Sequence, residues 1–178
     1  YRPAPNLKER IAASTLPTAT ERFRLSLIHG EVHDPDAWSL DGVAGHAGLF
    51  STAADLARFA QMLLDGGTYG GVRILRAETL GEMTRIFATS SLDEPRGLGF
   101  EIDQPWYMGD LAGHRTIGHT GYTGTSLVVN LEKRAFAILL TNRLHPVDHR
   151  TNLRVYRSGV GTLAATALAM LGPRAAGK

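Results

Sequence analysis

The sequence contains no cysteine, which excludes disulfide bonds, thiolate zinc sites and a cysteine nucleophile. No apolar run approaches the ~20 residues that a membrane-spanning helix needs. The formal net charge is only +2, from 19 Lys and Arg against 17 Asp and Glu, and no basic run resembles a nucleic-acid-binding surface. We therefore expect no nucleic-acid partner and no membrane-spanning segment.

What is present is the composition of a globular protein, with 178 residues, 43% of them hydrophobic and 20% charged. This length suits one domain or a large piece of one, and it can bury a sizeable core. Residues 1–48 contain several prolines and little periodicity, so we expect an irregular segment there. A long loop segment at the start of a compact domain tends to be functional or to lean on further structure.

Two helices are predicted after this segment. The stretch Ser51–Asp55 resembles a capping box with Thr52 as the N-cap residue. It begins an apolar helical face that includes Phe59 and ends at Gly66–Gly67. A short hairpin around Gly70–Gly71 and a second helix over 77–87, with Ile86 and Phe87 facing inward, are expected next.

Strands follow the helices. They are predicted over residues 99–102, 114–119, 125–131 and 135–142, the last two as an antiparallel hairpin. A closing helix is predicted over 151–171, with one broad inward face that includes Tyr156, Leu163, Ala164 and Leu168. This order indicates an α+β fold whose last helix packs on a face of an antiparallel sheet. We expect a single domain with three parts: irregular loops over 1–48, a helical portion over 49–96, and the sheet with its C-terminal helix over 97–178.

No serine lies in a recognisable nucleophile motif. The Gly-x-Ser-x-Gly elbow is absent, and no serine is followed three positions later by a lysine. A Ser-x-x-Lys nucleophile pair is therefore not encoded in this chain.

Histidines offer a metal site as one alternative. His145 and His149 are four residues apart, but Pro146 interrupts any helix that would present both rings. A zinc site needs three or four ligands, so surface or capping histidines are the favoured interpretation. We therefore expect no metal and no cofactor. A metal-dependent hydrolase that uses His145, His149 and an acidic residue is kept as an alternative.

The segment Gly118–Gly124 is the best candidate for chemistry. It places His119 and Thr120 at the end of a predicted edge strand, where side chains alternate between the two faces. Gly121 would permit a close approach by a ligand, and free N–H groups at such a point can donate to an oxyanion. On the pattern alone, a glycine-rich turn that only connects two strands is favoured.

The same segment carries a family resemblance. His119-Thr-Gly followed by Tyr-Thr-Gly-Thr-Ser resembles the third active-site box of the β-lactamase-related, penicillin-recognising serine hydrolases, which is Lys-Thr-Gly in many members and His-Thr-Gly in some. Residues 47–59 resemble the family's Gly-Leu-x-Ser-Thr-x-x-Asp-Leu-x-Arg-Phe helix start, and residues 97–100 and 139–142 resemble the strands on either side of the box. The ordered match runs from about Gly30 to Leu171.

This resemblance implies a class C β-lactamase, DD-peptidase or family VIII-type esterase, of which the chain is the C-terminal portion. The fold would be an antiparallel sheet flanked by helices beside part of a helical subdomain. The implied chemistry is an acyl-serine mechanism, without cofactor, on an ester, a peptidoglycan-like D-peptide or a β-lactam amide. The resemblance also implies that the nucleophile lies in a missing N-terminal half of the domain and that this chain alone is inactive. By analogy, the cell envelope or periplasm is the expected location.

The resemblance assigns roles to the box. His119 would help to position the proton-transfer network and supply a pH-dependent positive potential, and Thr120 would offer its hydroxyl to the substrate. The backbone N–H of Tyr122 would be one of two oxyanion donors. Gly121 would keep the strand edge open, and Thr123 would contribute to substrate binding.

Three further residues are weaker candidates. His33, Asp34 and His46 would line the cleft from the helical side, and a capping or loop-bracing pair is an equal alternative for the first two. A non-catalytic domain that binds cell-wall peptides or a protein partner through the same groove is the main rival to the enzyme.

Overall fold

The computed structural model describes residues 1–17, 24–89, 94–148 and 151–172. Contacts divide the chain into two compact units. We call residues 1–52 and 141–151 the loop unit, and residues 53–140 and 152–178 the sheet unit. The predicted division at residues 48 and 96 stays a prediction.

The sheet unit is built on a six-stranded antiparallel sheet with the strand order β3-β4-β5-β6-β7-β8. Neighbours in the sheet are also neighbours in the chain, so the sheet is a meander. The strands are β3 (Ala88–Thr89), β4 (Pro95–Arg96), β5 (Glu101–Ile102), β6 (Thr116–Thr120), β7 (Ser126–Asn130) and β8 (Ala135–Leu139). The predicted α+β class with an antiparallel sheet is confirmed.

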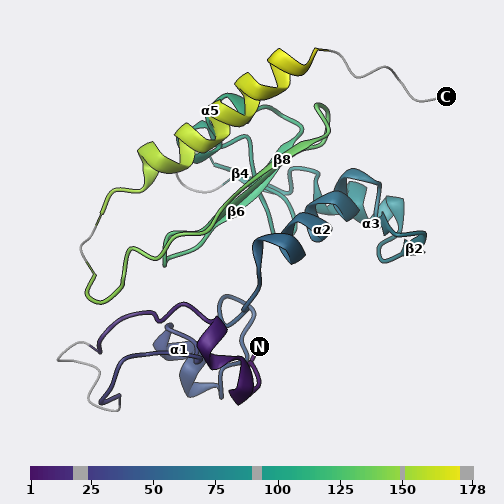
Figure 1. Cartoon of the computed structure of the whole chain (residues 1–178). Helices are drawn as coiled ribbons and strands as arrows, with labels where there is room; N and C mark the ends of the chain where they lie inside the picture. Colours follow the sequence, from purple (N-terminus) through teal and green to yellow (C-terminus); the bar gives the residue numbers. More distant parts are fainter. Residues whose placement is uncertain (18–23, 90–93, 149–150, 173–178) are drawn as a thin grey trace. The chain divides into compact units, whose positions relative to one another are not determined.

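Helices cover both faces of this sheet (Figure 1). On one face, α2 (Ala53–Leu64) buries Leu63 against Ile117 and Val129. On the other face, α5 (Arg154–Leu171) packs with Val128. Because successive side chains of a strand point to opposite faces, neighbouring residues of β7 serve two separate cores.

The elements after α2 follow the prediction in part. The helix ends before Gly66 and Gly67, both with positive φ, and β1 (Thr68–Tyr69) pairs with β2 (Val72–Arg73) around a two-glycine turn. However, α3 (Ala77–Met83) ends four residues before the predicted Phe87. The Phe87 N–H donates instead to the Arg96 carbonyl at 2.8 Å and leads into β3.

Side chains that were predicted to face inward are exposed at three places. Phe87 is 47% exposed, because its segment leaves α3 for the sheet, and Phe59 of α2 is 39% exposed. In α5, Tyr156 and Leu163 were predicted to face the core but are 60% and 71% exposed. Ala164 and Leu168, which were also predicted to face inward, do pack against the second core, together with Ala165.

Two short elements, which were not predicted, complete the second core. They are α4 (Pro105–Met108) and the 3₁₀ turn η2 (Gly109–Leu111), which together bury Tyr107, Met108 and Leu111. An element of three or four residues is too short to show a helical period in its sequence.

The loop unit is mostly irregular, as predicted, with a 3₁₀ helix η1 (Pro5–Arg10) and a short helix α1 (Pro35–Ser39). Ile28 and Leu144 are buried in it. The amide side chain of Asn142 donates to the Ala13 carbonyl at 2.5 Å, and the Leu16 N–H donates to the Pro146 carbonyl at 2.8 Å. Residues 142–146 are therefore hydrogen-bonded to the N-terminal residues.

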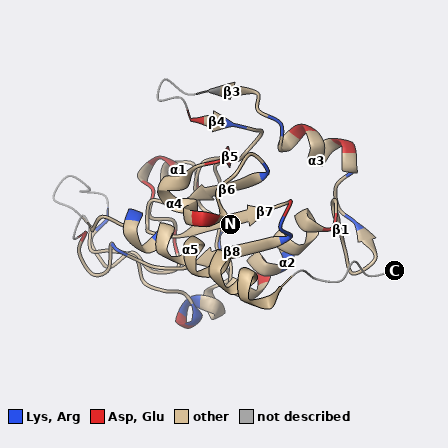
Figure 2. Cartoon of the chain, turned by 90° about the horizontal axis from the view of Figure 1, so that it is seen from above, with Lys and Arg blue, Asp and Glu red and all other residues tan. Residues whose placement is uncertain are grey.

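Charged side chains of both signs are interspersed along the elements (Figure 2), in keeping with the small net charge of +2. None of the described helices is long and apolar enough to cross a membrane.

Candidate active site

The His-Thr-Gly segment lies at the C-terminal end of β6 and leads into a tight hairpin to β7. His119 is paired with Leu127, and Thr120 with Ser126. The Gly121 N–H donates to the Thr125 carbonyl at 2.8 Å, and the Gly124 N–H donates to the Gly121 carbonyl at 3.0 Å. The loop between the strands is therefore only the three residues Tyr122–Gly124, a common hairpin connection.

Two glycines make this hairpin possible for different reasons. Gly124 has a φ of 124°, a backbone conformation that residues other than glycine rarely adopt. A Cβ at Gly121 would lie 2.3 Å from the Thr125 hydroxyl oxygen. The glycine at 121 therefore leaves room for the Thr125 side chain, whereas the prediction had expected it to leave room for a ligand.

The prediction that this segment ends an edge strand is wrong for β6 as a whole. β6 lies inside the sheet, between β5 and β7. However, β5 reaches only as far as the pairs Glu101–Gly118 and Ile102–Ile117. Within the described strands, the last two residues of β6 are thus paired on one side only, by β7. The end of an interior strand projects past its shorter neighbour.

The side chains at this strand end are accessible. His119 is exposed, Thr120 and Thr123 are half-buried, and Tyr122 is 65% exposed. His119 has the same strand parity as Ile117 and so belongs to the α2 face, whereas Thr120 belongs to the α5 face. These groups therefore share a position at the end of β6 but do not lie on the same face of the sheet.

The imidazole of His119 is oriented by its own backbone. Its Nδ1 lies 2.8 Å from the Thr120 carbonyl oxygen. Because a carbonyl oxygen only accepts, Nδ1 carries the hydrogen, and Nε2 of the neutral ring is the acceptor.

Arg157 of α5 was not among the predicted site residues, yet it contacts this hairpin directly. Its Nη2 donates to the Gly121 carbonyl at 2.8 Å and to the Thr125 carbonyl at 3.2 Å. The signal in the sequence is weak, because Arg157 is one of two arginines in the first turns of a helix that is otherwise uncharged.

A buried polar cluster lies behind the strand end. Tyr107 is fully buried, and a Cβ at Gly118 would lie 2.9 Å from its hydroxyl. Glu101 is 6% exposed, and its Oε1 lies 3.0 Å from Nη2 of Arg96. Burial first, and then the nearby Glu101 carboxylate, raise the pKa of Tyr107. Tyr107 is therefore a neutral phenol, and its hydroxyl packs against Gly118 of β6.

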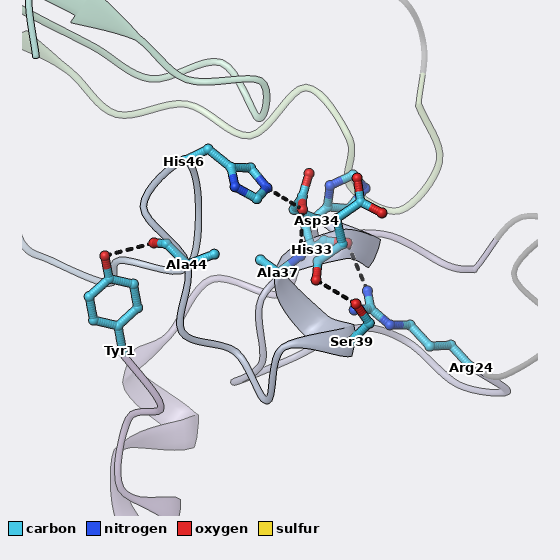
Figure 3. A network of polar contacts seen from close by, with 9 residues as sticks. Tyr1, Arg24, His33, Asp34, Ala37, Ser39, Ala44 and His46 are labelled. Atoms are coloured by element: carbon cyan, nitrogen blue, oxygen red, sulfur yellow. Dashed lines mark hydrogen bonds and ion pairs between the residues drawn. The ribbon is translucent and has the colours of Figure 1, made fainter.

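The other predicted residues lie in the loop unit and form a separate network (Figure 3). Asp34 caps α1, because its Oδ1 accepts a hydrogen bond from the Ala37 N–H at 2.8 Å. The same oxygen lies 2.9 Å from Nε2 of His46. The His33 carbonyl accepts from Arg24 at 2.8 Å. The structure thus brings Asp34 and His46 together and gives Asp34 a capping role.

The electrostatics of this network favour an ionised carboxylate. The hydrogen bond from the Ala37 N–H is the main cause that lowers the pKa of Asp34, and His46 adds to it against the opposing effect of burial. A cavity of about 310 Å³ in the same unit is lined by Trp38 and Phe50, among others. His33, Asp34 and His46 are not among its lining residues.

The alternative metal site has little support in the residues that are described. His149 lies outside them, and within them no group of three or more His, Cys, Asp or Glu side chains is placed to hold a metal ion.

Comparisons with known proteins identify the family and the fold. The sequence model of the family described as Beta-lactamase matches residues 4–160. A protein of Escherichia coli strain K12 named "Putative D-alanyl-D-alanine carboxypeptidase" is 40% identical over 145 residues, which are 77% of this chain and 32% of that protein. The chain therefore spans about a third of the length of the curated relatives it matches.

Solved structures show the same fold. A β-lactamase from Mycobacterium bovis superposes with a TM-score of 0.54 at 22% identity, over 68% of this chain and 46% of that one. A penicillin-binding protein homologue from Caulobacter crescentus gives 0.53 at 22% identity, over 68% and 33%.

The fold is thus that of the β-lactamases and penicillin-binding proteins. The chain belongs to the β-lactamase family, whose members are serine hydrolases. The resemblance drawn from the His-Thr-Gly box is confirmed at the level of the family.

Proposed function

We propose that this chain provides the substrate-facing strand end of a hydrolase that works through an acyl-serine intermediate. The observation that carries the proposal is the hairpin at 119–124, which places an exposed imidazole on one face of the sheet, a half-buried hydroxyl on the other, and the Tyr122 amide in the turn that follows. The nucleophilic serine is proposed to lie in residues outside this chain, because no Ser-x-x-Lys occurs within it.

The proposed reaction has two steps. The serine oxygen attacks the carbonyl carbon, its proton passes to the leaving group, and the bond to that group breaks. Water then attacks the acyl-serine, which releases the acid and restores the hydroxyl. In both steps the carbonyl oxygen becomes an oxyanion that needs preorganised donors.

The residues of the hairpin take distinct roles in this proposal. The Tyr122 N–H donates to the developing oxyanion, and Thr120 offers its hydroxyl to the substrate. His119 presents Nε2 to the proton-transfer network, consistent with the tautomer that its Nδ1 contact requires. Protonation would convert it into a cation that attracts a substrate carboxylate.

The substrate that we propose first is a peptide ending in D-alanyl-D-alanine. The name of the 40% identical relative supports it. Esters and β-lactam amides share the same acyl chemistry and are the alternative substrates.

A labelling experiment tests the proposal. The natural protein that contains these residues, and the 178-residue chain by itself, are each treated with a fluorescent penicillin and with a p-nitrophenyl ester. We expect a covalent adduct and a burst of p-nitrophenol from the natural protein and neither from the chain alone. Peptide binding without any adduct would indicate a non-catalytic domain, and labelling of the isolated chain would contradict the assignment of the serine to other residues.

A further inference from the structure

We propose that Arg157 is a positioning residue that orients and polarises the peptide group between Gly121 and Tyr122. This inference rests on the proposed function, because that peptide group carries the proposed oxyanion donor. Arg157 belongs to the last helix of the chain and is 36 residues from Gly121 in sequence.

The contact is a bridge made by one nitrogen atom. Nη2 of Arg157 donates to the Gly121 carbonyl at 2.8 Å and to the Thr125 carbonyl at 3.2 Å. The Gly121 carbonyl also accepts from the Gly124 N–H, and the Thr125 carbonyl also accepts from the Gly121 N–H. The guanidinium therefore binds both carbonyl oxygens that close the hairpin.

The geometry of a peptide bond transmits this contact to Tyr122. The carbonyl of Gly121 and the N–H of Tyr122 belong to one planar unit, and in a trans peptide they point in opposite directions. Among the described residues the cis bond recorded is at His145–Pro146, not here. Holding the Gly121 oxygen toward Arg157 therefore directs the Tyr122 N–H away from α5.

The charge of Arg157 adds a second effect. A guanidinium is permanently protonated, and a charged donor makes a stronger hydrogen bond than a neutral one. Hydrogen bonds in sequence polarise each other, so a cation on the carbonyl makes the N–H of the same peptide a better donor. Arg157 would thus strengthen the oxyanion donor without touching the substrate.

The first test examines the peptide group in the 178-residue chain by NMR. Arg157→Gln removes the charge, Arg157→Lys keeps it, and Arg58→Gln removes an exposed arginine paired with Asp55 on α2. We expect the Gly121 carbonyl carbon and the Tyr122 amide nitrogen to move upfield in R157Q, to move less in R157K, and to stay unchanged in R58Q. A folded R157Q or R157K variant with wild-type shifts at both atoms would overturn the inference.

The second test measures catalysis in the natural protein. For a p-nitrophenyl ester we expect R157Q to lower kcat about tenfold with KM unchanged, because the donor is weakened and not removed. A boronic acid, whose adduct places an oxygen in the oxyanion position, should bind about tenfold more weakly. R157K should recover part of both losses, and R58Q should match the wild type.

The second test separates failure of the proposed function from failure of the inference about Arg157. A wild-type protein that forms no acyl adduct overturns the proposed function, while the NMR shifts still decide whether Arg157 orients the peptide. A wild type that acylates, together with R157Q at the same kcat or with a loss confined to thermal stability, overturns the catalytic part of the inference alone.

Discussion

Gly161 of α5 lies directly against the carbonyl group of Met108 in α4. A Cβ at position 161 would lie 1.9 Å from the Met108 oxygen and 2.6 Å from its carbonyl carbon. Both atoms are backbone, so no side-chain rotation can relieve the contact. This approach fixes which side of α5 faces the sheet, and it places Arg157, one turn earlier, against the hairpin.

Gly161→Ala is therefore expected to destabilise the protein by about 3 kcal/mol or more, the upper range for overpacking in a core. Gly159 is a matched control, because it lies in the same helix and nothing is within 4 Å of the position its Cβ would take. Gly159→Ala should stabilise the helix by up to ~1 kcal/mol. Urea unfolding of both variants measures the contrast, and equal effects would contradict the close packing of α4 and α5.

The same contact explains where prediction from sequence succeeded and where it failed in α5. The apolar period correctly predicts a long terminal helix, but it selects Leu163 as a core residue when that side chain is 71% exposed. A glycine at 161 appears in the sequence only as a weak helix former. Its role depends on a backbone approach from residues 53 positions earlier, which no local pattern encodes.

In the candidate site, too, the residues found from the sequence are those with local signals, and the residue missed depends on distant contacts. His119, Thr120 and Tyr122 could be singled out because the family resemblance rests on a box of consecutive residues, and their roles stay predictions. Arg157 could not, since its partners are carbonyl oxygens on another element. For Asp34 the sequence left a cap and a place in the cleft as equal alternatives, and the structure shows that its carboxylate caps α1.

Asp34 gives a prediction about pH. Its pKa is lowered in the folded state, chiefly by the Ala37 N–H, so its carboxylate stabilises the fold fully above its ordinary pKa of 3.8. That contribution is lost as the pH falls through the lower, folded-state value. A ¹³C NMR titration of the Asp34 carboxyl should give a midpoint below 3.8.

Asp34→Asn should remove this part of the acid sensitivity while keeping an oxygen for the cap. Asp34→Ala should loosen α1, with a cost of roughly 1 kcal/mol or less, since the carboxyl is partly exposed. Faster hydrogen exchange at the Ala37 amide reports the loss. An Asp34 titration at or above its ordinary pKa would show that the capping bond does not persist in solution.

His119→Lys tests the charge at the strand end. Lysine keeps its positive charge at pH 8, whereas an imidazole loses its charge within the physiological range. In the natural protein we expect the variant to lower KM for a D-alanyl-D-alanine peptide, whose carboxylate it would attract, by severalfold at pH 8. KM for a neutral p-nitrophenyl ester serves as the control and should not change. An equal effect on both substrates would argue against a carboxylate near residue 119.

The most direct measurement concerns the Tyr122 N–H itself. Tyr122 is the second residue of the turn that the Gly124 N–H closes onto the Gly121 carbonyl, a position that favours proline. Tyr122→Pro removes the N–H, while Tyr122→Ala removes only the exposed side chain. In the natural protein we expect Y122P to acylate about 10²- to 10³-fold more slowly than Y122A, the loss that accompanies removal of one oxyanion donor. Equal acylation rates in the two folded variants would contradict the assignment of this strand end as the active-site edge.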